Sequence, residues 1–199
     1  MDKIIFATSN QGKVREIKAI LASIGANAEV LSLKEAGITT EIIEDGTTFE
    51  ENALIKARTI CKETGLLTLS DDSGLEVDYL GGEPGIYSAR YLGEDTPYSI
   101  KNPNIIKRLE GVPDEQRTAR FVCACAAVFP DGREEVIRRA MEGRIAYKEA
   151  GENGFGYDPI FYLPEYNRTS AELSPEEKNK ISHRGKALRA MCELIFKGL

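Results

Sequence analysis

The stretch KIIFATSNQGKVREIKAIL, residues 3–21, decides the fold. Residues 4–7 are four consecutive apolar side chains, which indicates a short buried strand, and the polar residues 8–12 are typical of a turn. From residue 13 on, apolar side chains recur at helical spacing, which predicts an amphipathic helix. A strand, a polar loop and a helix in this order are the opening unit of an α/β protein.

The first half of the chain continues this alternation. Residues 28–31 and 67–70 have strand character, and a helix is predicted between them. This helix begins after Thr48, with Glu51 in capping-box register, and ends at Gly65. The second of these strands is predicted to end at two acidic residues, with a turn directly after them at Ser73 and Gly74.

The second half introduces an antiparallel element. Residues 120–129 are nearly continuously apolar, and a PDGR turn at residues 130–133 leads into residues 136–144. This pattern predicts a long hairpin, so the central sheet should be mixed, with helices flanking it. Further helices are predicted over residues 104–109, from Pro175 on, and after Ser182.

Composition and charge exclude several classes of protein. Of the 199 residues, 42% are hydrophobic and 29% are charged, which excludes a disordered chain, a collagen-like fibre and a membrane bundle. The 26 Lys and Arg against 32 Asp and Glu give a formal net charge of -6, which argues against broad nucleic-acid binding but not against a compact anionic ligand.

With no repeat and no long polar linker, we expect a single domain over residues 1–199. The apolar residues 4–7 are too few for a signal peptide or a membrane span, so we expect a cytoplasmic protein.

The four cysteines do not indicate a metal site. They lie at Cys61, Cys123, Cys125 and Cys192, with no C-x-x-C pair, and the chain has one histidine, His183. A zinc site is therefore not expected. Cys123 and Cys125 are two residues apart in an apolar run, which places both on one face of a strand, as buried reduced thiols.

The loop at residues 8–12 is a candidate anion site. It differs from the phosphate-binding P-loop, because Ala7 and Val14 stand where that pattern requires Gly and Ser or Thr. Backbone N–H groups at a helix start, together with Lys13, can nevertheless bind an anion. The alternative is an ordinary strand-to-helix turn with a solvated lysine.

Two adjacent carboxylates, Asp71 and Asp72, form a second candidate site at the end of a predicted strand. Magnesium takes hard oxygen ligands, commonly one or two carboxylates with substrate phosphates, and Glu44 with either aspartate could supply them. The alternative is that one aspartate caps the turn through Ser73 and Gly74 while the other is solvated.

The third candidate combines an aromatic, Gly-rich loop with basic residues. Residues 155–158 read FGYD, Lys178 follows, and residues 182–184 read SHR. An aromatic ring can stack on a purine while Arg and backbone groups bind its edge. The alternative is that the ring fills the core and that the histidine is structural.

Taken together, these motifs resemble the inosine triphosphate pyrophosphatase family, which hydrolyses non-standard purine triphosphates such as ITP, dITP and XTP. The resemblance runs nearly from end to end. It rests on ATSNQGK at 7–13, TFEENA at 48–53 with KA at 56–57, DDSGL at 71–75, PGIYSAR at 84–90, GFGYDPIF at 154–161 and SHRG at 182–185.

The resemblance implies an elongated, two-lobed α/β fold with substrate in the cleft, a magnesium (Mg²⁺) requirement and a homodimer. The implied reaction is attack of water on the α-phosphorus of a deaminated purine triphosphate, with pyrophosphate leaving. It implies that Asp72 is the base for water and that Glu44, Asp71 and Asp72 manage the metal.

The implied substrate contacts fall into three groups. The phosphates would be held by Lys56 together with Thr8, Ser9, Asn10, Gln11, Gly12 and Lys13. Ser73 would touch the substrate, and Phe155 would stack on the purine. The base pocket would be lined by Gly156, Tyr157, Asp158, Lys178, His183 and Arg184.

Two other functions stay open at this point, and one segment departs from the pattern of the family. One alternative is a phosphatase that forms an aspartyl-phosphate at Asp71 or Asp72, and the other is a module that binds nucleotide without hydrolysis. The departure lies at residues 96–103, where two prolines indicate a longer loop in place of the helix start that is usual in the family.

Overall fold

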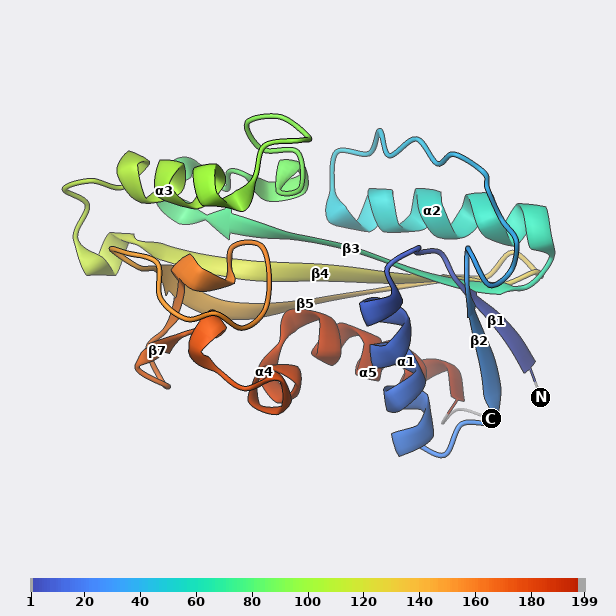
Figure 1. Cartoon of the computed structure of the whole chain (residues 1–199). Helices are drawn as coiled ribbons and strands as arrows, with labels where there is room; N and C mark the ends of the chain where they lie inside the picture. The colour runs from blue at the N-terminus through green and yellow to red at the C-terminus, as the bar shows by residue number, and fades with distance from the viewer. Residues whose placement is uncertain (1, 197–199) are drawn as a thin grey trace. The chain divides into compact units, whose positions relative to one another are not determined.

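The computed structural model describes residues 2–196 and shows an α/β fold (Figure 1). Seven strands hydrogen-bond in the order β2-β1-β3-β4-β5-β6-β7. β1 pairs in parallel with β2 and β3, whereas β6 pairs antiparallel with β5 and β7. The predicted mixed sheet is therefore confirmed. The strands are β1 (Asp2–Phe6), β2 (Ala28–Ser32), β3 (Leu67–Val77), β4 (Thr118–Val128), β5 (Glu134–Ile145), β6 (Phe161–Leu163) and β7 (Arg168–Thr169).

Five α-helices accompany the sheet in this part of the chain. They are α1 (Gln11–Ser23), α2 (Phe49–Thr64), α3 (Tyr98–Arg108), α4 (Pro175–Ile181) and α5 (His183–Phe196). No helix among residues 2–196 is both long enough and apolar enough to cross a membrane.

The chain divides into two compact units. The first comprises residues 2–72, 123–139 and 184–196, and the second comprises residues 73–122 and 140–183. The chain passes from one unit to the other within β3, β4 and β5, and again at the start of α5. Each unit has its own hydrophobic core. A single domain with a substrate cleft stays a prediction.

In the first unit, the alternation of side chains along β1 separates two layers of helices. Ile4 and Phe6 are buried in one cluster with α1 and α5, whereas Ile5 and Ala7 are buried with Ile60 of α2. Figure 1 shows α2 on one face of these strands and α1 and α5 on the other. Successive residues of a strand point to opposite faces, so the first apolar run of the chain binds both layers.

The cysteines lie in these cores as free thiols. Cys61, Cys123, Cys125 and Cys192 are all buried and unbridged. Cys123 and Cys125 belong to the same cluster as α1 and α5, which confirms the prediction from their spacing.

The predicted start and end of α2 are confirmed, with one change. The Thr48 hydroxyl accepts the N–H of Glu51 at 3.1 Å, and Gly65 ends the helix with φ +65°. The Glu51 carboxylate, however, accepts the N–H of Thr47 at 2.6 Å in place of the N–H of Thr48 that a capping box uses.

The turn predicted at Ser73 and Gly74 is wrong, because β3 continues without a break through the acidic residues and these two positions. Leu75 and Val77, which follow them, are fully buried in the core of the second unit. Asp and Gly are poor strand formers and favour turns, so the sequence indicates a break. The buried apolar residues on both sides keep the strand extended.

The helix predicted over residues 104–109 is present, but the loop predicted over residues 96–103 is wrong, because the helix begins earlier. α3 begins at Tyr98, with Pro97 as its N-terminal cap residue and Pro103 inside the helix. Pro97 lacks an N–H that the helix would leave unpaired at this position. Lys101 and Asn102, on the next turn, are 1% and 2% exposed, so their buried contacts help to hold the helix despite Pro103.

Candidate active site

The loop between β1 and α1 is exposed at the N-terminus of a helix. Asn10 caps α1, and its Oδ1 accepts the N–H groups of Gly12 at 2.9 Å and Lys13 at 3.2 Å. Residues 9–12 are exposed, and the positive end of the helix dipole lies at this loop. A bound anion would therefore share these N–H groups with the Asn10 side chain. Of the other loop residues, Thr8 accepts the N–H of Asn10 at 3.1 Å, Gln11 donates to Ser32 at 3.4 Å, and Ser9 is exposed.

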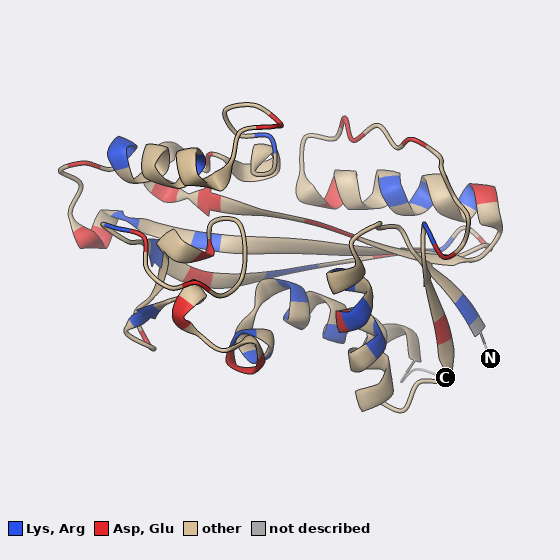
Figure 2. Ribbon diagram, viewed as in Figure 1, with Lys and Arg blue, Asp and Glu red and all other residues tan. Residues whose placement is uncertain are grey.

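On one face of β3, Asp71 joins two cations. Lys13 Nζ lies 2.9 and 2.8 Å from the two carboxylate oxygens, and Arg184 Nε lies 3.2 Å from Oδ2. Burial opposes ionisation of this carboxyl, but Lys13 and Arg184 outweigh burial and hold the pKa of Asp71 well below its usual value. Asp71 therefore fixes a cation from α1 beside a cation from α5. Lys and Arg occur on α1, α2 and α5 in Figure 2.

Asp72 has different partners. Its Oδ1 lies 3.7 Å from Lys56 Nζ, which is 2.7 Å from Glu44 Oε2. Burial raises the pKa of Asp72, and Glu44 adds to this effect, whereas Lys56 and a hydrogen bond from Asn52 oppose it. Burial disfavours the charged form of Lys56, but Asp72 and Glu44 outweigh burial, so the pKa of Lys56 is raised.

Asn52 connects the loop that carries Glu44 to this face of the strand. It is 2% exposed, donates a hydrogen bond to Asp72, and accepts the N–H of Gly46 at 2.9 Å. A Cβ at Gly46 would lie only 2.7 Å from Asn52 Oδ1, so the close approach requires glycine. Sequence reasoning did not single out Asn52, although it lies inside the TFEENA motif.

The two carboxylates therefore belong to two separate sets of residues. A turn would bring them together, but neighbours on a strand point to opposite faces. Asp71 lies with Lys13 and Arg184, and Asp72 lies with Lys56 and Glu44. Among residues 2–196, no three His, Cys, Asp or Glu side chains form a group that could hold a metal ion by themselves.

In the second unit, the aromatic loop folds around a buried carboxylate. Asp158 is 2% exposed, and its Oδ2 accepts the N–H of Phe155 at 2.8 Å and Lys178 Nζ at 2.5 Å. Its Oδ1 accepts the Ser170 hydroxyl at 2.9 Å. The Phe155 ring is 64% exposed, and Lys178 Nζ lies 5.0 Å from its centroid. The Phe155 ring is thus exposed on a loop whose backbone is fixed. Nothing in the sequence pointed to Ser170.

Two other predicted residues of the base pocket are buried against neighbours. Tyr157 is 3% exposed and donates from its hydroxyl to the carbonyl of Ser88 at 2.7 Å, and burial raises its pKa above the usual value. His183 is 8% exposed, and its ring stacks on Phe121 with centroids 5.1 Å apart. Arg184, predicted at the purine edge, has its side chain on Asp71 in the first unit. Ser73 is half-buried on β3.

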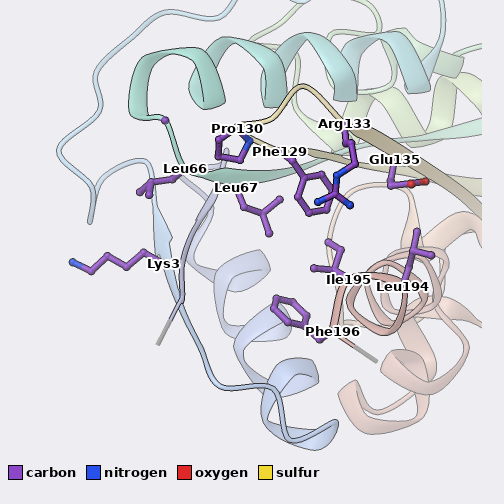
Figure 3. A pocket seen from close by; sticks show the side chains of 11 residues that line it. Lys3, Leu66, Leu67, Phe129, Pro130, Arg133, Glu135, Leu194, Ile195 and Phe196 are labelled. Carbon is purple, nitrogen blue, oxygen red and sulfur yellow. The ribbon is translucent and has the colours of Figure 1, made fainter. Parts of the chain in front are cut away.

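A cavity of about 590 Å³ also lies in the first unit, and Figure 3 shows its lining. None of the predicted site residues contributes to it. Most of its lining is apolar, with a few charged side chains at the rim, and includes Leu66, Leu67, Phe129, Leu194, Lys3 and Arg133.

These features define a mixed-sheet α/β protein with a carboxylate on each face of one central strand. The chain belongs to the Ham1 family, whose family model matches residues 4–194. It is 51% identical over 195 residues to a dITP/XTP pyrophosphatase of Bacillus licheniformis, an alignment that covers 98% of each chain. The structure of the Staphylococcus aureus Ham1 protein matches with a TM-score of 0.90 and 39% identity over 99% of each chain. A HAM1 protein from Coxiella burnetii matches with a TM-score of 0.91 and 39% identity over 98% of each chain.

Proposed function

We propose that this protein hydrolyses non-standard purine nucleoside triphosphates, such as dITP, ITP and XTP, to the monophosphate and pyrophosphate. This reaction would remove deaminated purines from the nucleotide pool. The observation that carries the proposal is the division of Asp71 and Asp72 between the two faces of β3, each with its own cations. The dITP/XTP pyrophosphatase that is 51% identical to this chain supports the substrate class.

The first set of residues binds phosphate. Lys13 and Arg184 are held side by side by Asp71, and the N-terminus of α1 adds backbone N–H groups. A triphosphate carries several negative charges, and fixed cations with a helix N-terminus stabilise them without rearrangement. Asp71 is 1% exposed in its side chain, so it acts through the two cations that it positions.

The donor chemistry around Lys56 fits magnesium. Glu44 and Asp72 are hard oxygen donors that share one lysine, and two carboxylates with substrate phosphates are a common Mg²⁺ environment. When bound, Mg²⁺ neutralises charge on the phosphates. A direct contact between Asp71 and the metal stays a prediction. Both carboxylate oxygens of Asp71 already accept hydrogen bonds from Lys13.

Asp72 is the proposed general base. Its carboxylate accepts a proton from water while the water oxygen forms a bond to the α-phosphorus, and the bond from that phosphorus to the pyrophosphate oxygen breaks. Burial raises the pKa of Asp72 in the metal-free protein, and a carboxylate positioned beside the attacking water can serve as general base. Lys56 balances its charge and, with Lys13 and Arg184, stabilises the charge on the phosphates.

The loop that carries Phe155 binds the base. The exposed Phe155 ring offers a stacking face, and Lys178 lies beside it as a hydrogen-bond donor for a 6-oxo group. Asp158 holds both residues in place. Hydrogen bonds from His183 or Arg184 to the purine stay predictions. The homodimer and the cytoplasmic location, which the resemblance implies, belong to the proposal as well.

Hydrolysis in water labelled with oxygen-18 tests the reaction. With dITP and Mg²⁺, direct attack on the α-phosphorus predicts label in dIMP and none in pyrophosphate. Label in inorganic phosphate with a trapped phosphoaspartate would favour the aspartyl-phosphate mechanism. Binding of dITP without any product would favour a nucleotide-binding module.

A further inference from the structure

The first turns of α3 lie against the loop that carries Phe155. Asn102 Nδ2 donates to the carbonyl of Gly156 at 3.2 Å. The Tyr98 ring meets the Tyr157 ring edge to face, with centroids 5.0 Å apart. It also lies 3.6 Å from the position that a Cβ would take at Gly156. These contacts come from residues 98–102, at the start of α3, a segment to which the sequence assigned no role.

The loop is fixed from both sides of Phe155. The Asp158 carboxylate holds the N–H of Phe155, and Asn102 holds the carbonyl of the next residue, Gly156. Gly156 has φ +66°, a conformation that glycine adopts readily. The exposed Phe155 ring therefore projects from a stretch of backbone that has a buried anchor on each side.

Among residues 2–196, the bond to Gly156 is the one side-chain hydrogen bond that the buried Asn102 makes. The residue is 2% exposed, and its Oδ1 has no hydrogen-bond partner among residues 2–196. An unpaired buried acceptor destabilises a fold, so an apolar side chain would suit this site better if the bond to Gly156 were unimportant. Lys101 anchors the same turn, since its Nζ donates to the carbonyl of Ala89 at 2.6 Å and lies 4.9 Å from the centroid of the Tyr98 ring.

We infer that Asn102 and Tyr98 are positioning residues for base recognition: they preorganise the 155–157 backbone so that the Phe155 ring is presented to a purine. The inference rests on the proposed function and deepens it. A fixed platform binds a flat ligand better than a loose one, because no ordering cost is paid on binding. The effect should fall on ligands that contain a base and not on the polyphosphate alone.

Calorimetric titration with two probes, dIMP and pyrophosphate, separates these effects. Asn102→Ala should raise the Kd of dIMP about five-fold, the effect of losing one hydrogen bond, and leave the Kd of pyrophosphate unchanged. In steady-state assays with dITP the same variant should raise KM more than it lowers kcat. The matched control is Asn104→Ala, which removes a 2.8 Å hydrogen bond from Tyr91 to the same helix without touching the loop.

A second variant keeps the test decisive if Asn102→Ala does not fold. Tyr98→Leu keeps an apolar side chain on α3 but removes the ring edge from Tyr157, and it should also weaken dIMP selectively. Unchanged dIMP affinity in the folded variants, or equal weakening of dIMP and pyrophosphate, would overturn the inference. Wild-type protein that binds dIMP but does not hydrolyse dITP would refute the proposed function alone, and wild-type protein that hydrolyses dITP without measurable affinity for dIMP would refute the inference alone.

Discussion

Replacing Asp71 by Asn should destabilise the protein strongly, because it leaves two cations without their shared anion. The Asp71 side chain is 1% exposed, and those of Lys13 and Arg184 are 21% and 13% exposed. Removing one partner of a buried ion pair costs about 3–5 kcal/mol. Since water can reach part of both cations, we expect about 3 kcal/mol, the lower end of that range.

Urea unfolding at pH 7 in chelator measures this loss. With a slope of about 2 kcal/mol per molar urea, the midpoint of Asp71→Asn should fall by about 1.5 M. The matched control is Asp78→Asn, which breaks a two-point ion pair with Arg120 on a side chain that is 42% exposed. An exposed pair contributes about 0–1 kcal/mol, so the control midpoint should fall by less than about 0.5 M.

The pH dependence of this difference checks its electrostatic origin. The pKa of Asp71 is lowered in the folded protein, so its contribution to stability is complete above its unfolded pKa of about 3.9. It is lost as pH falls further, through the folded pKa. The gap between wild type and Asp71→Asn should therefore be constant from pH 5 to 8 and shrink below about pH 4. Equal midpoint shifts in Asp71→Asn and Asp78→Asn, or a gap that widens in acid, would refute the reasoning.

Three further predictions concern activity. Asp72→Asn should lower kcat for dITP about 10²- to 10⁴-fold while the nucleotide still binds in calorimetry; near-normal kcat would remove it as the base. Phe155→Ala should raise the KM for dITP, since stacking contributes about 1–3 kcal/mol per base, and a silent substitution would mean that the base is bound elsewhere. Activity should vanish in EDTA, return with Mg²⁺ and return partly with Mn²⁺, and Glu44→Gln should raise the Mg²⁺ concentration needed for half-maximal rate. Full turnover in chelator, or an unchanged Mg²⁺ requirement in Glu44→Gln, would contradict the metal proposal.

The elements predicted correctly are those that local sequence specifies. The strand at the N-terminus, α1, α2 and the β4–β5 hairpin each combine a clear hydrophobic period with a matching cap or turn. Thr48 and Gly65 mark both ends of α2 because capping is a local interaction. β6 and β7, with three and two residues, are too short to produce a period and were not predicted.

The errors occur where distant residues decide the local structure. Asp71 lies in an extended strand whose apolar neighbours are buried in the cores, and its partners Lys13 and Arg184 are 58 and 113 residues away. α3 includes Pro103, and the side chains of Lys101 and Asn102 on its early turns find buried partners in other segments. Helix and strand propensities do not register such contacts.

The candidate site was predicted as a set of residues but not as an arrangement. Its motifs place a cation after β1, carboxylates on β3 and an aromatic ring in a Gly-rich loop, and all of these are present. The pairing of Arg184 with Asp71, and the separation of Asp71 from Asp72, depend on strand geometry. Because we expected a turn directly after Asp71 and Asp72, their separation was not predicted.

We propose that the protein hydrolyses deaminated purine triphosphates between the α- and β-phosphates. The most direct test compares initial rates on dITP, XTP, dATP and dGTP with Mg²⁺ and measures pyrophosphate and phosphate separately. Adenine presents an amino group where hypoxanthine presents an acceptor, and one unpaired buried donor costs about 1–3 kcal/mol, so kcat/KM for dATP should be about 10- to 100-fold lower than for dITP. Pyrophosphate should be the initial product from dITP and XTP. Equal efficiency on dITP and dATP, or phosphate as the initial product from every substrate, would contradict the claim.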